Sequence, residues 1–106
     1  MSDLEVPQQG DNPAMYVYGR LAALGLCLQA YGFTVEHVAG GLVVRNPSAP
    51  RRRFDQPVAG DTIRCLPRAD DGGRYWFFTS WRQPIAEAER VADAWAVISG
   101  YLGTPR

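Results

Sequence analysis

The chain has 106 residues, of which 46% are hydrophobic and 21% charged, and this fits one globular domain with a modest core. Its 11 basic residues are all arginine and balance 11 acidic residues, so no net field attracts nucleic acid or a membrane surface. The absence of lysine excludes a Schiff-base lysine, a catalytic lysine amine and the lysine of a phosphate-binding loop.

Cysteine usage and the N-terminal pattern point to a reducing compartment. Cys27 and Cys65 are too far apart for the usual metal-ligand spacing, and two cysteines make no disulfide framework. We therefore expect two free thiols, no metal and no cofactor. The N-terminus lacks the pattern of a signal peptide, and no apolar run is long enough to span a membrane. We expect a cytoplasmic protein without membrane association.

Residues 1–12 are polar and aperiodic, so we expect a flexible N-terminal tail. Asn12 and Pro13 predict the start of a helix, because Asn is a favoured N-cap residue and Pro fits the first helical position. The helix is predicted from Pro13 to about Tyr31, and Gly32 is placed to end it.

This helix is apolar around most of its circumference. Its main stripe has helical spacing and consists of Val17, Leu21, Leu24, Leu28 and Tyr31. Every residue from 21 to 28 is apolar or Gly, including Leu26, which lies away from the stripe. Either the same chain buries this surface or a second copy covers it in a helix-mediated homodimer.

The middle of the chain reads as strands joined by turns. A β-hairpin signal surrounds Ala39-Gly40-Gly41, and the turn at residues 69–73 joins two further strands. A long Pro- and Arg-rich loop over residues 47–60 separates the two pairs. The predicted strands are Phe33–Val38, Leu42–Asn46, Asp61–Leu66 and an aromatic strand within Arg74–Trp81.

A second helix is predicted from Pro84 to about Leu102, with an apolar stripe that begins at Ile85. The fold class is therefore α+β: a helix, a four-stranded antiparallel sheet and a helix, in one compact domain over residues 13–106.

Alternation along the strands predicts two different sheet faces. The expected core face comprises Phe33, Val35, Leu42, Val44, Ile63, Cys65, Trp76 and Phe78. The opposite face mixes charged, hydroxyl and aromatic side chains: Thr34, Glu36, Val43, Arg45, Thr62, Arg64, Tyr75, Phe77 and Thr79. Binding surfaces have this composition, so the candidate ligand- or partner-binding residues are Arg45, Arg64, Tyr75, Phe77 and Glu36. A slip of one residue would exchange the two aromatic sets.

The run Arg51-Arg52-Arg53-Phe54 raises the alternative of nucleic-acid binding, since arginine neutralises phosphates and aromatic rings stack on bases. Such a run is more often a solvated loop, so we rank this hypothesis second.

Catalytic signals are weak. His37 is the only histidine, Ser80 and Thr79 have no neighbouring base, and turn chemistry explains Asp70-Asp71. A third hypothesis is a small ligand-binding protein or enzyme that uses Arg45, Arg64, Tyr75 and His37.

The favoured hypothesis is a non-catalytic interaction or accessory module that acts through its sheet face and first helix. We expect a homodimer that binds a protein partner.

Overall fold

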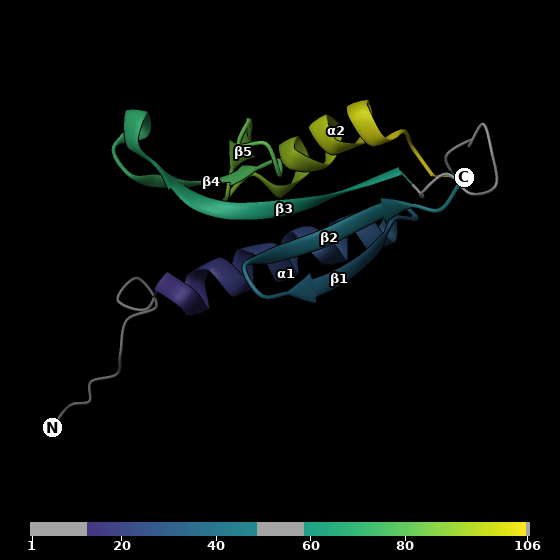
Figure 1. The fold of residues 1–106 in the computed structure, drawn as a ribbon, viewed down its shortest axis with the longest axis horizontal. Helices are drawn as coiled ribbons and strands as arrows, with labels where there is room; N and C mark the ends of the chain where they lie inside the picture. Colours follow the sequence, from purple (N-terminus) through teal and green to yellow (C-terminus); the bar gives the residue numbers. More distant parts are fainter. Residues whose placement is uncertain (1–12, 49–58, 106) are drawn as a thin grey trace, which may run out of the picture.

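The computed structural model describes residues 13–48 and 59–105. In chain order its elements are α1 (Pro13–Ala30), β1 (Thr34–Val38), β2 (Gly41–Asn46), β3 (Ala59–Arg68), the 3-10 turn η2 (Ala69–Asp71), β4 (Arg74–Phe78), β5 (Pro84–Glu87) and α2 (Val91–Leu102) (Figure 1). The α+β class is confirmed, with two described helices and one antiparallel sheet, but the sheet has five strands where four were expected.

Helix α1 follows its sequence signals closely. It ends at Ala30, and Gly32 then takes the left-handed conformation with φ 96° while its N–H bonds to the Gln29 carbonyl. The buried side of the helix carries Leu21, Leu24 and Leu28. Leu26, away from this stripe, is 70% exposed. Part of the surplus apolar surface of α1 therefore stays uncovered by the described chain.

The strands form a simple antiparallel meander in the order β1-β2-β3-β4-β5. The ten-residue β3 holds the sheet together, because its first half pairs with β2 and its second half with β4. Strands β1 and β5 are the two edges of the sheet.

The expected face assignment of the aromatic strand is wrong by one residue. Strand β4 places Phe77 opposite Cys65 and Tyr75 opposite Pro67. Residues opposite each other share a face, and Cys65 is in the core, so Phe77 is completely buried. Trp76 lies on the other face of the sheet, where its indole N–H reaches the Asp71 carboxylate at 2.8 Å.

The predicted second helix is also wrong over its first part, since Pro84–Glu87 is the edge strand β5. A turn precedes it, in which the Arg82 N–H bonds to the Thr79 carbonyl and Arg82 has a φ of 69°. Proline suits an edge strand because its missing N–H leaves no ladder bond broken there. The helix itself starts at Val91, after a turn closed by the bond from Arg90 N–H to the Glu87 carbonyl.

Both helices pack on the same face of the sheet, giving a two-layer structure. Figure 1 shows α1 beside the β1–β2 hairpin and α2 beside β4 and β5. One hydrophobic core lies between the layers, formed by Leu21, Leu24, Leu28, Phe33, Leu42, Val44, Ile63, Cys65, Phe77, Ile85, Ala86, Ala88, Ala94, Ile98 and Leu102. Within the described ranges, no helix is both long and apolar enough to cross a membrane.

Candidate interaction surfaces

The face of the sheet opposite the helices, which we call the outer face, is left uncovered by the elements that the structure describes. Neither described helix packs on it, because the buried side chains of both belong to the core on the other side. Four half-buried apolar side chains from three strands lie near its centre: Val43, Leu66, Trp76 and Phe78. Arginines and a glutamate surround them: Glu36, Arg45, Arg64, Arg68 and Arg74.

Trp76 is held rigidly in the middle of the second hairpin. Its indole N–H donates to Asp71 at 2.8 Å, and the Arg68 guanidinium lies 4.4 Å from the ring centroid. Arg68 is fixed in turn by a hydrogen bond of 2.6 Å from its Nε to Asp70. This bond raises the pKa of Arg68 and lowers the pKa of the Asp70 carboxyl. The indole is therefore oriented before any partner arrives.

The other three arginines of the outer face also have partners. Arg64 donates to the Gly40 carbonyl at 2.9 Å, and Arg45 lies 3.9 Å from Glu36. Arg74 lies 3.4 Å from Glu87 and 4.0 Å from Asp71. With Asp70 included, four carboxylates accompany the four arginines, so the charge of this surface is balanced.

The predicted binding residues divide between the two faces. Arg45, Arg64 and Glu36 lie together on the outer face as expected. Tyr75 and Phe77 do not join them, because both point toward the helices: Phe77 is a core residue and Tyr75 packs edge-on against Tyr16. The binding role of all five stays a prediction. Arg51, Arg52, Arg53 and Phe54 lie outside the described residues.

Sequence reasoning missed the aromatic part of the outer face, namely Trp76 and Phe78. One signal could have placed them. A buried indole N–H requires an acceptor, and the expected core face offered none, whereas Asp70 and Asp71 stand in the turn just before the strand. The position of these two carboxylates favours a Trp76 that faces away from the core.

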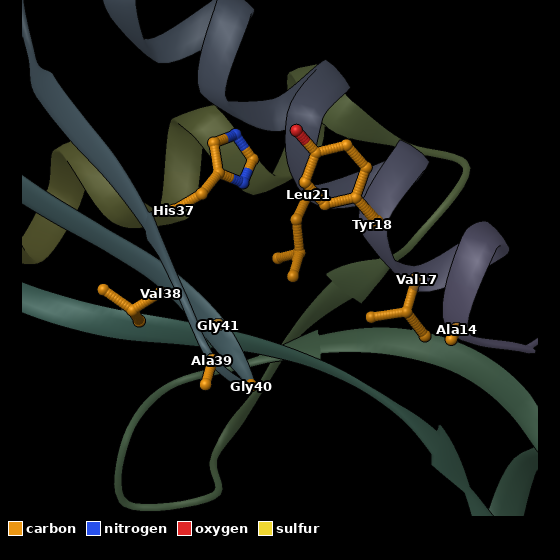
Figure 2. Close-up of a pocket in the computed structure, with 9 residues that line it drawn as sticks. All are labelled: Ala14, Val17, Tyr18, Leu21, His37, Val38, Ala39, Gly40 and Gly41. Carbon is orange, nitrogen blue, oxygen red and sulfur yellow. The ribbon is translucent and has the colours of Figure 1, made fainter.

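A second surface, which we call the seam, lies between α1 and the edge strand β1. Near the hairpin turn it contains a turn-side hollow of about 410 Å³, lined by Ala14, Val17, Tyr18, Leu21, His37, Val38, Ala39, Gly40 and Gly41. Farther along it contains a mid-strand hollow of about 260 Å³, lined by Ala22, Gly25, Leu26, Gln29, Val35 and His37. Figure 2 shows the rings of Tyr18 and His37 side by side at the turn-side hollow, with centroids 5.0 Å apart.

A polar recess of about 300 Å³ lies beside Arg45, Asp61 and Ser80. Asp61 is already engaged there, because it accepts bonds from the Ser80 and Thr62 N–H groups and from the Tyr101 hydroxyl. Burial, followed by the bond to Asp61, raises the pKa of Tyr101. These contacts anchor α2 to β3 and leave Asp61 without the free geometry that a general base needs.

Among the residues that the structure describes, no group of three or more His, Cys, Asp or Glu side chains could hold a metal ion. No protein-family model, curated protein or solved structure matches the chain.

Proposed function

We propose that this chain is a non-catalytic protein-interaction module, working as a homodimer, that binds a protein partner through the outer face. The observation that carries the proposal is the composition and openness of that face. Its apolar centre contains Trp76 and Phe78, and charged side chains surround this centre. Protein interfaces have this arrangement of an aromatic centre and a polar rim.

The rigid setting of Trp76 supports a protein partner. Tryptophan and arginine are enriched among the residues that dominate binding energy, and fixing a side chain in advance reduces the entropy lost on binding. Arg68 and Asp71 fix the indole in this way. The partner should therefore offer an apolar surface with charges of both signs at its edge.

Charge balance disfavours nucleic acid at the same face. Affinity for a phosphate backbone comes from uncompensated Arg or Lys charges, and the four arginines here are balanced by four carboxylates on the same surface. Arg68 also covers one side of the Trp76 ring, so a base cannot stack there without displacing it.

Site-specific photo-crosslinking tests the proposal in the cells that make this protein. A benzophenone amino acid replaces Phe78 on the outer face or, as a control, Val97, an apolar α2 residue that is 43% exposed. We expect a discrete protein adduct from position 78 and none from position 97. The adduct should disappear when Trp76→Ala is added to the same chain, with the circular dichroism spectrum unchanged.

Three results would contradict the outer-face proposal. One is no adduct from position 78, a second is an adduct removed by nuclease, and a third is an adduct that survives Trp76→Ala. An adduct made only of two copies of this chain would show that the outer face is the dimer contact and not the surface that binds a partner.

A further inference from the structure

The two edges of the sheet differ in their protection against pairing with another strand. Natural edge strands are shielded by proline, bulges, charges or short length. β5 has four residues, begins with Pro84 and pairs irregularly with β4 next to Phe78. β1 pairs with β2 in unbroken register, contains no proline, and carries one carboxylate, Glu36. Among the described strands, β1 therefore offers the unprotected edge.

The seam beside this edge is lined mostly by apolar side chains, together with Tyr18, Gln29 and His37. Neither of its hollows is lined by an Asp, Glu or Arg side chain. Two of the largest exposed apolar side chains of the described chain border it: Leu26 is 70% exposed and Tyr18 is 61% exposed. Water contact with this surface is unfavourable, so covering it would be stabilising.

We infer that β1 and α1 form the contact between two copies of this chain, joined by a two-fold axis. This inference rests on the homodimer part of the proposed function and specifies where the dimer forms. β1 would pair antiparallel with β1 of the other protomer and continue the sheet, which places the two α1 helices side by side on the core side.

Charge favours a second copy as the occupant of the seam. The whole chain has a formal net charge of zero, so two copies meet without net repulsion. The two hollows of the seam contain no Asp, Glu or Arg side chain on either copy, so covering them desolvates no ion pair. A partner of strong charge would gain no complementary contact there.

The two-fold axis limits the register. Opposite residues of a continuous sheet share a face, so the axis must pass through one residue of β1. An axis at Glu36 would set two carboxylates against each other, which is unfavourable. An axis at either end of the strand, Thr34 or Val38, would leave most of β1 unpaired, so the axis should pass through Val35 or His37. With His37 at the axis, the partner's Val35 lies opposite Ala39 and points toward the turn-side hollow.

Light scattering during size-exclusion chromatography tests the dimer and its location. The native chain should show twice its 11.7 kDa mass at micromolar concentration. Leu26→Arg should raise the dimer dissociation constant about ten-fold or more, because it sets two cations in an apolar contact. Val97→Arg, the matched change on an exposed α2 position, should leave it unchanged.

Cysteine crosslinking tests the strand pairing itself. Opposite residues in an antiparallel pair lie within disulfide distance, so either Val35→Cys or His37→Cys should give an oxidised dimer, and Tyr101→Cys should not. This inference is overturned if the native chain is a dimer whose dissociation constant is unchanged by Leu26→Arg. It is also overturned if neither β1 position gives a crosslinked dimer. Either result leaves the outer-face proposal intact. A monomer at all concentrations overturns the homodimer altogether.

Discussion

Asn46 joins the two layers of the fold through one buried side chain. Only 1% of its surface is exposed, and its Nδ2 donates to the Leu102 carbonyl at the end of α2, at 3.0 Å. Its Oδ1 accepts from the Ser48 N–H at 2.9 Å. Gly103, which follows α2 with a φ of 86°, leaves room for this amide, since a Cβ there would lie 3.1 Å from Nδ2.

Asn46→Asp should destabilise the fold at neutral pH. The change removes the donor and sets a buried carboxylate against the Leu102 carbonyl, so we expect a loss of about 2–3 kcal/mol in the free energy of unfolding. Urea unfolding at pH 7 measures it. At pH 4 the protonated acid can donate again, and part of the loss should return.

The matched control is Gln83→Glu, the same chemical change at an exposed position where the amide oxygen already serves as an acceptor for Trp81. It should change the free energy of unfolding by less than about 0.5 kcal/mol. Equal effects of the two changes would show that Asn46 has no special structural role.

The buried Cys65 thiol and the half-buried Tyr16 phenol predict lower stability at alkaline pH. Burial raises the pKa of Cys65 from 9.0 to about 12. Burial, followed by the bond to Glu89, raises the pKa of Tyr16 from 10.0 to about 12. Between pH 9 and pH 12 the unfolded chain therefore loses these protons before the folded chain does, and the free energy of unfolding falls as pH rises. The slope is at most about 1.4 kcal/mol per pH unit for Cys65, and it is smaller for Tyr16, whose partly exposed hydroxyl is screened by water.

Urea unfolding at pH 8, 9.5 and 10.5 measures this decline. Cys65→Ala should reduce the decline in the free energy of unfolding that begins near pH 9. Tyr16→Phe should reduce the decline that begins near pH 10. The comparison uses slopes against pH, so a constant loss from either substitution does not obscure it. Unchanged slopes in both variants would refute the assignment.

At the scale of the element, the two phenylalanines of β4 should differ sharply. Phe77 is completely buried, so Phe77→Ala should reduce the free energy of unfolding by about 3–5 kcal/mol. Phe78 is half-buried on the outer face, and Phe78→Ala should cost less than about 1.5 kcal/mol. Urea unfolding of the two variants measures both losses. If Phe77→Ala does not fold, Phe77→Leu replaces it. The reverse order would restore the face assignment expected from sequence.

Elements with strong local signals could be predicted from sequence. The N-terminal helix has a proline start, a glycine end and a leucine stripe, and it forms over Pro13–Ala30. The first hairpin forms around Gly40, whose φ of 80° suits a tight turn.

The misplaced elements depended on tertiary contacts. Both alternating sets of the aromatic strand are apolar, so the pattern contains no information about which set faces the core. Residues 84–87 extend the stripe of the following helix, and only their pairing with β4 makes them a strand. In the candidate site, too, the residues with a clear local pattern were placed on the right face and those without one were not. Glu36, Arg45 and Arg64 come from strands with clear alternation and were grouped correctly, whereas Trp76 and Phe78 were not.

At the scale of the whole molecule, the two proposed surfaces do not compete. The outer face is on the side of the sheet away from both helices, and the seam lies along one edge on the helix side. A dimer through β1 would join the outer faces of two sheets into one continuous surface. A partner could then contact two copies of Trp76 at once and gain affinity from the second site.

The unequal edges of the sheet also determine how large an assembly can become. Strand pairing can propagate into a fibre only if each subunit has two adhesive edges. In a dimer through β1, that edge would be covered in both copies, and the outward edge of the pair would be β5 on both sides, with its proline and irregular pairing. Such a dimer would expose no further unprotected edge among the described strands, so strand pairing would stop at two copies.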